Sequence, residues 1–250
     1  MTLLTSIGKI FNPILDPIFE YLLKLPEFWC IFIITFLVSL VSVLIYKKLT
    51  DQKLLKEIKE ELNKLKREMK STKDTQKILA LQKKSMELSV KQMKQTMKPM
   101  IATLLPILII FAWLATHLAY YPLIPGEEFN VTIYFKDSAS GNVEIMLPAA
   151  IELLDNKTKQ VNNSVTWRLL PKQEGEYTVN FLYNNETYSA EVLITKKRLY
   201  KEPIKFYRDD VRKIVISNKP VRVFGLSWFW IYLILAVILN TLLRKLLKVY

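Results

Sequence analysis

The chain has 250 residues, with 36 Lys and Arg against 23 Asp and Glu, so its formal net charge at pH 7 is +13. Its mean hydropathy is positive (+0.16) although 24% of its residues are charged, a combination that a soluble globular protein rarely shows. Strongly apolar blocks are therefore expected to alternate with strongly polar ones. The single cysteine, Cys30, excludes a disulfide framework and a cysteine metal cluster.

The N-terminal segment, residues 1–27, is predicted to form an amphipathic helix, because its apolar side chains recur at the spacing of one helix face. Two prolines are expected to kink this helix. We expect it to lie on the outer membrane surface and to end near Pro26. The alternative is a flexible lead-in that packs on the membrane spans. The apolar positions are Leu3, Ile7, Ile10, Ile14, Ile18 and Leu22, and the prolines are Pro13 and Pro17.

Three stretches are predicted to cross a membrane, namely residues 28–46, 100–121 and 225–243. None contains Asp, Glu, Lys or Arg. At about 1.5 Å per residue, each reaches roughly the 30 Å of a bilayer core. A buried helix of a soluble protein rarely runs this long without charge. The remaining residues, 244–250, form a short basic tail.

Residues 47–99, between the first two spans, are predicted to form an antiparallel coiled-coil hairpin. They carry 16 Lys and Arg against 7 Asp and Glu, a net charge of +9. The two arms meet at residues 71–74, which we interpret as a capping box. The seam of the first arm is Leu55, Ile58, Leu62, Leu65 and Met69, and the second arm offers Ile78, Leu79, Met86, Val90, Met93 and Met97.

Residues 122–224 are predicted to form a β-rich domain, because their periodicity changes from helical to alternating. Residues 131–135 alternate, and so do residues 177–183 and 188–194, which a short turn joins as a hairpin. Trp167 and Tyr177, among several short strands, suggest an immunoglobulin-like sandwich. The predicted fold class is thus an α-helical membrane protein with three spans, an N-terminal helix, a coiled-coil hairpin and an extracellular β-sandwich-like domain.

Two independent signals predict the orientation in the plasma membrane. The positive-inside rule places the basic hairpin in the cytosol, so the N-terminus and the β domain lie outside and the basic tail lies inside. All sequons of the chain fall within the predicted outer domain. An Asn- and Thr-rich β domain would give the same pattern by chance. The candidate glycosylation sites are Asn130, Asn156, Asn162 and Asn185.

Polar side chains within the spans are expected near the cytosolic leaflet. They suggest a hydrated groove that is open to the cytosol, since polar groups in lipid tend to face protein or a water-filled cavity. Helix–helix hydrogen bonding explains the same residues equally well. Thr116 and His117 are expected towards the outer side. The candidate groove residues are Thr35, Ser39, Ser42, Thr103, Asn240 and Thr241.

The hairpin carries two further candidate sites. Soft methionine side chains near the membrane, at Met93, Met97 and Met100, are candidates for contacting apolar client segments. Coiled-coil packing is the alternative, and it explains Met69 and Met86 better. Phosphate contacts to ribosomal RNA are expected from the basic side chains, although anionic lipid would attract the same charge. These candidates are Lys64, Lys66, Arg67, Lys70, Lys73, Lys77, Lys83 and Lys84.

Two segments resemble a known family. Residues 97–113 (MKPMIATLLPILIIFAW) look like the second span of archaeal YidC-like membrane proteins. Residues 225–232 (GLSWFWIY), continuing to 240–247 (NTLLRKLL), look like their third span. That family belongs to the Oxa/YidC/Alb superfamily, which includes the third subunit of the ER membrane complex. The resemblance covers residues 1–121 and 222–250 and leaves out the β domain.

The resemblance implies a membrane-protein insertase or chaperone that binds ribosomes and nascent membrane proteins and eases insertion through its groove. Bacterial members carry a groove arginine, whereas no predicted span here contains Arg or Lys. A channel or ion-handling protein is an alternative, weakened because no Asp or Glu lies within the spans. A surface receptor or scaffold is another. The chain has one histidine and no hydrolase, zincin or Walker motif, so we expect neither enzymatic activity nor a cofactor.

Overall fold

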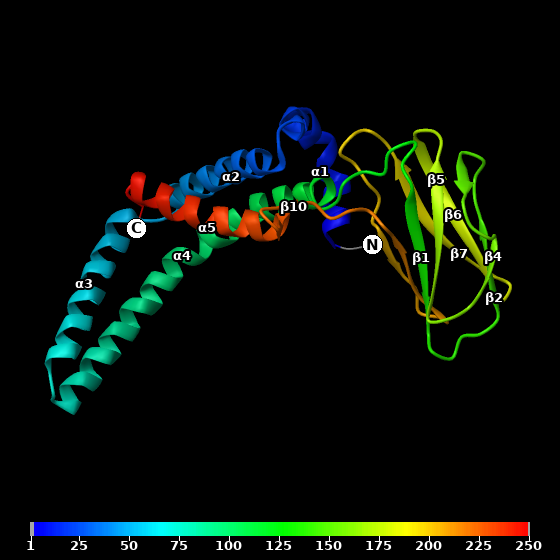
Figure 1. The fold of residues 1–250 in the computed structure, drawn as a ribbon. Coiled ribbons are helices and arrows are strands. Elements are labelled where there is room, and N and C mark those ends of the chain that lie inside the picture. The colour runs from blue at the N-terminus through cyan, green and yellow to red at the C-terminus, as the bar shows by residue number, and fades with distance from the viewer. Residues whose placement is uncertain (1–2, 250) are drawn as a thin grey trace. The chain divides into compact units, whose positions relative to one another are not determined.

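The computed structural model describes residues 3–249 (Figure 1), which divide into two units. One unit comprises residues 28–111 and 230–250 and is helical. The other comprises residues 1–27 and 112–229 and contains the β domain. Within this described part of the chain, three helices are long and apolar enough to cross a membrane. They are α2 (Glu27–Leu49), α4 (Thr75–His117) and α5 (Trp228–Leu246).

In the helical unit, α2 is followed by α3 (Gln52–Ser71), which pairs with the first part of α4 as a hairpin (Figure 1). Asp51 caps α3, because its Oδ1 accepts hydrogen bonds from the amides of Lys53 (3.0 Å) and Leu54 (3.1 Å). The capping-box interpretation of residues 71–74 was wrong. Ser71 ends α3 and donates to the Glu68 carbonyl, while Asp74 caps α4 from outside the helix.

The first arm of the hairpin buries its predicted seam residues Leu55, Ile58 and Leu65. The predicted seam of the second arm was wrong except at Ile78. Its shielded side chains instead follow the heptad spacing of Ile78, Leu81, Ser85 and Leu88, which are all half-buried. An ion pair between Lys84 and Glu61 (2.7 Å) joins this side of α4 to α3. The other predicted seam residues, Leu79, Met86, Val90, Met93 and Met97, are exposed.

Helix α4 continues from the hairpin into the second span as one helix of 43 residues, with Pro99 and Pro106 inside it. It ends at His117, four residues before the predicted end of that span at Tyr121. The chain leaves the helix there because Tyr120 pairs with Pro220 and the amide of Tyr121 donates to a backbone carbonyl of the β unit. The second span is therefore shorter at its C-terminal end than its hydropathy suggested.

The N-terminal segment contains α1 (Leu3–Phe19) and a 3₁₀ turn, η1 (Glu20–Lys24). Pro13 and Pro17 both lie inside α1.

The third span begins later than predicted. The segment around Gly225 forms a two-stranded hairpin, in which Phe224 and Gly225 have positive φ angles (52° and 79°), and α5 starts only at Trp228.

The β domain is a sandwich of two antiparallel sheets, with strand orders β3-β5-β1-β9-β8 and β4-β2-β6-β7. Alternate side chains of both sheets, including Trp167, fill one core. Asn184 and Asn185 both adopt positive φ, as a two-residue hairpin turn requires. The strands are β1 (Phe129–Phe135), β2 (Asn142–Met146), β3 (Ile151–Leu153), β4 (Thr158–Gln160), β5 (Ser164–Pro171), β6 (Gly175–Tyr183), β7 (Glu186–Ile194), β8 (Ile204–Phe206), β9 (Val211–Ile216), β10 (Arg222–Val223) and β11 (Leu226–Ser227).

The central strands follow the immunoglobulin arrangement, with β5 beside β1 in one sheet and β2, β6 and β7 in the other. The C-terminal strand β9 occupies the position of the usual first strand. Tyr177 lies near the start of β6, and its hydroxyl donates to the carbonyls of Gln173 and Glu174 (3.3 and 3.2 Å). That is the geometry of a tyrosine corner. In immunoglobulin domains the buried tryptophan lies on the third strand, to which β2 corresponds here. Trp167 lies on β5 instead.

Candidate functional site

An apolar ridge of six residues runs along α4 on the exposed side of the hairpin, and we call it the methionine ridge. Its members are spaced by three, four or seven residues, so they share one helix face. Exposed fractions are 68% at Met86, 55% at Met93, 48% at Met97 and 64% at Met100. Beyond Met100 the exposed apolar face continues at Ile101 into the second span. The six residues are Leu79, Met86, Val90, Met93, Met97 and Met100.

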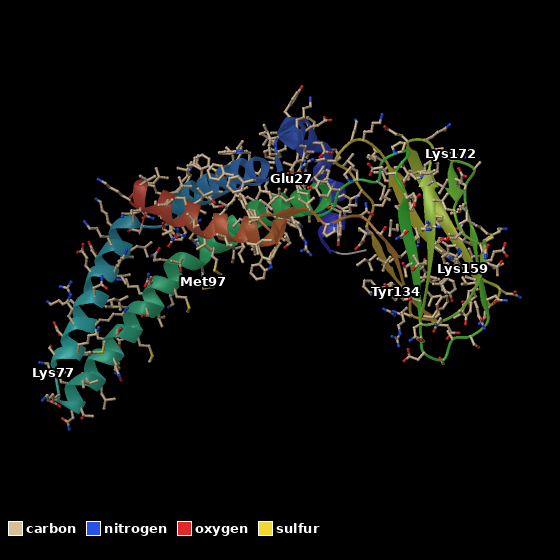
Figure 2. The ribbon with its side chains drawn as sticks, in the orientation of Figure 1. Glu27, Lys77, Met97, Tyr134, Lys159 and Lys172 are labelled. Carbon is tan, nitrogen blue, oxygen red and sulfur yellow. The ribbon has the colours of Figure 1, made fainter. Side chains whose placement is uncertain are left out.

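The ridge is unusual for a water-facing helix arm, which normally exposes polar residues opposite its buried seam. Figure 2 labels Met97, on α4, and shows the sulfur atoms along this helix in yellow. The sequence favoured coiled-coil packing as the explanation for Met86. That explanation is wrong, because the Met86 side chain is exposed. Met69, on α3, is half-buried as packing predicts. Unbranched, polarizable methionines can adapt to differently shaped apolar partners.

The predicted groove residues of α2 are all buried. Thr35, Ser39 and Ser42 lie on one face of the helix. The Thr35 hydroxyl donates to the Ile31 carbonyl of its own helix (2.6 Å). Within residues 3–249, the Ser42 hydroxyl has no hydrogen-bond partner although it is buried. A buried hydroxyl without a partner costs about 1–3 kcal/mol, so a water bound beside Ser42 would be stabilised.

The other predicted groove residues are less enclosed. Thr103 is half-buried and donates to the Met100 carbonyl (3.1 Å), and the exposed Thr241 donates to the Val237 carbonyl (2.7 Å). Asn240 is half-buried. Among the described residues, no hydrogen bond joins one of the six candidates to another. The three helices thus satisfy most of these polar groups locally.

Asn240 has a partner that the sequence did not indicate. Its Oδ1 accepts a hydrogen bond from Nε of Arg244, one turn later on α5 (2.9 Å). The Arg244 guanidinium also lies over the ring of Tyr46, with Cζ 4.1 Å from the ring centroid. This geometry provides a cation–π interaction. A fixed positive charge therefore stands at the end of the third span. The i, i+4 spacing of Asn240 and Arg244 was the available signal.

The predicted ribosome-binding side chains are all exposed on the hairpin, and Figure 2 labels Lys77 near its tip. The Lys84 ammonium is the exception in having an ionic partner, since Glu61 accepts from it. That hydrogen bond raises the pKa of the Lys84 side chain above its ordinary value. The exposed set is Lys64, Lys66, Arg67, Lys70, Lys73, Lys77, Lys83 and Lys84.

In the β-containing unit, α1 is fastened to the end of α4 by a polar cluster that the sequence analysis missed. Asp16 Oδ1 accepts from Nε1 of the Trp113 indole (2.7 Å) and lies 3.3 Å from Nε2 of the buried His117. Asn12 donates to Thr116 Oγ1 (3.2 Å). Asp16, the one acidic residue in the sequence of α1, was the available signal.

The opposite face of α1 is apolar and exposed at Ile10, Ile14 and Ile18. These side chains recur every four residues, so they form one stripe along the helix. An exposed apolar stripe of this kind is what an interfacial helix presents to lipid. Leu3 and Ile7, which were predicted to extend the stripe, have side chains outside the described part of the structure.

The family model for integral membrane proteins described as EMC3/TMCO1-like matches residues 12–147, more than half of the chain. The chain belongs to the EMC3/TMCO1-like family. This family is membrane-integral and is linked to membrane-protein insertion, and it is related to the Oxa1/YidC-type insertases. No curated protein and no solved structure matches the chain.

The family match contains the first two spans and the whole hairpin, and it ends just after β2. The third span and most of the sandwich lie beyond it. Three of the four sequons, at Asn156, Asn162 and Asn185, lie beyond the matched residues, whereas Asn130 lies inside the match. All four asparagines are exposed, so each is sterically open to a glycan.

Proposed function

We propose that this EMC3/TMCO1-like protein is an insertase or chaperone that binds apolar segments of nascent membrane proteins on its methionine ridge. The observation that carries the proposal is the exposure of Met86, Met93, Met97 and Met100 on a helix that continues into a membrane span. An apolar client segment bound there would keep its own surface away from water. The same helix would then lead it to the bilayer.

The topology proposed for this role is multi-pass in the plasma membrane, with the N-terminus outside and the hairpin in the cytosol. The net charge of +9 on residues 47–99 supports this orientation through the positive-inside rule. Exposed cations on the hairpin would contact ribosomal RNA and hold the ribosome near the ridge. Within the family, we place the chain with the archaeal YidC-like proteins, because of its resemblance to their second and third spans.

Transfer of a client also requires its polar flank to pass the hydrocarbon core. Each unsatisfied polar group that enters an apolar medium costs several kcal/mol. We propose that hydroxyls on the buried face of α2, above all the unpartnered Ser42, offer hydrogen bonds along part of that path. Asn240 and Thr241 of α5 and Thr103 of α4 would complete a polar, cytosol-facing groove. No covalent step is required, so we propose no enzymatic activity.

Photocrosslinking and insertion assays test this function. The full-length chain is reconstituted in liposomes with ribosome-bound nascent chains that carry a short polar flank and one apolar segment. A crosslinker at Met93 is expected to capture the apolar segment, and crosslinkers at Ser39 and Asn240 are expected to capture the flank. A crosslinker at the exposed Lys66 on α3 is the control. Equal insertion into empty liposomes, or capture only from Lys66, contradicts the proposal.

A further inference from the structure

A basic cavity lies at the C-terminal end of α5, and Thr241 is the one lining residue that it shares with the groove proposed above. It is shallow, with a volume of about 470 Å³, within the range of roughly 300–1,000 Å³ typical of small-ligand pockets. Four of its six lining residues are cationic and none is acidic. The six lining residues are Lys59 from α3, and Thr241, Arg244, Lys245, Lys248 and Val249 from α5 and the segment after it.

The segment after α5 is folded back so that Lys248 reaches this cavity. The amide of Val249 donates to the Arg244 carbonyl (2.8 Å) and the amide of Lys248 to the Lys245 carbonyl (3.3 Å), which is the Schellman pattern. Val249 is buried with Leu243 of α5 and with residues of α2 and α3. The hydrophobic contact therefore fixes the position of the segment.

The residue at the turn of this motif is a lysine where glycine is usual. Lys248 has a φ angle of 51°, in the left-handed region that disfavours side chains with a Cβ. Glycine there would remove the backbone strain and one of four neighbouring positive charges. A strained lysine that adds to like-charge repulsion indicates that an anion compensates it.

The common structural explanation for lysines here is attraction to the carbonyls that end a helix. Three of the carbonyls at this helix end already have donors. Val249 and Lys248 amides occupy the Arg244 and Lys245 carbonyls, and Nζ of Lys47 donates to the Leu247 carbonyl (3.0 Å). Arg244 itself is oriented by its hydrogen bond to Asn240 and by Tyr46, so its guanidinium is fixed beside the cavity.

We infer that this cavity binds the phosphate of an anionic membrane lipid. At about 1.5 Å per residue, the 19 residues of α5 span roughly the 30 Å hydrocarbon core, so the charged end lies at headgroup level. Leu242 and Leu246 are exposed on the same two turns, where acyl chains would lie. Basic pockets at the end of a span are a recognised setting for anionic headgroups.

Native mass spectrometry of the full-length chain tests the inference. The detergent-solubilised protein is titrated with phosphatidylglycerol, and phosphatidylcholine with the same acyl chains is the reference. The wild type is expected to prefer phosphatidylglycerol. Lys248→Gly and Lys245→Gln are each expected to weaken that preference about fivefold, since one Lys near a membrane surface contributes about 1 kcal/mol. Lys77→Gln, at the hairpin tip, is the matched control and is expected to leave the lipid preference unchanged.

Folding does not confound this experiment, because Lys248→Gly places the residue that a Schellman turn favours and should keep the thermal midpoint at least as high. An unchanged lipid preference in Lys248→Gly overturns the inference, as does an equal loss in Lys77→Gln. Inorganic phosphate that binds as tightly as the lipid would show a free-anion site instead. Loss of affinity for an RNA oligonucleotide, with lipid preference intact, would assign the cavity to RNA.

Discussion

Replacing Met86, Met93 and Met97 together by Gln is expected to abolish most client binding without unfolding the hairpin. Burying an exposed Met side chain completely is worth about 1.5–3 kcal/mol. These three side chains are between 48% and 68% exposed, so a client that covers them gains about 1 kcal/mol from each. Removing about 3 kcal/mol lowers affinity on the order of 100-fold. Gln has nearly the same length and helix propensity as Met.

The assay is the affinity of the full-length chain in detergent for a fluorescent peptide that contains an apolar membrane segment, measured by anisotropy. Hairpin stability should change by less than about 0.5 kcal/mol, because the replaced side chains lie on the surface. Met69→Gln on α3 is the matched control, since that methionine is half-buried and lies off the ridge. Undiminished affinity in the triple variant, or an equal loss in the control, would refute the role of the ridge.

Three further predictions concern other contacts. Asp16→Ala should cost about 1–3 kcal/mol by leaving the Trp113 indole without its acceptor, and hydrogen exchange should show faster opening of α1. If the hairpin binds ribosomal RNA, Lys66→Gln should reduce the slope of log affinity against log salt by about 0.9 in ribosome-binding titrations. A hydrogen bond from the backbone N–H of Arg168 holds the pKa of the Asp155 carboxyl below its ordinary value. The ionised Asp155 carboxylate therefore stabilises the folded β domain above the usual pKa of about 3.9, and this stabilisation is lost as pH falls through the lowered pKa. Asp155→Asn should remove this part of the pH dependence when unfolding of the β domain is measured in acid.

Several features of this protein could be predicted because they depend on neighbouring residues alone. The helices that can cross a membrane follow from uncharged runs of about 20 residues. The strands around Val131 and Phe181 follow from the alternation of apolar side chains, and both side chains are buried as expected. The turn at Asn184 follows from the tolerance of asparagine for positive φ.

The hairpin shows where sequence patterns fail. The first arm has one apolar stripe, so its seam was predictable. The second arm has two, and the more hydrophobic one, with Met86, Met93 and Met97, is the exposed one. The half-buried stripe contains Ser85, which a search for apolar periodicity would not select. The choice between stripes depends on which face meets α3, and periodicity does not contain that information.

By itself, then, the sequence determined the spans, the charge of the hairpin and the β character of residues 122–224, since hydropathy, charge and side-chain alternation are local properties. Only the tertiary structure decided which methionines face outward, that Asp16 meets Trp113 97 residues away, and that Lys248 turns back beside Arg244. Each of these depends on contacts between segments distant along the chain, whose free energy no local pattern records.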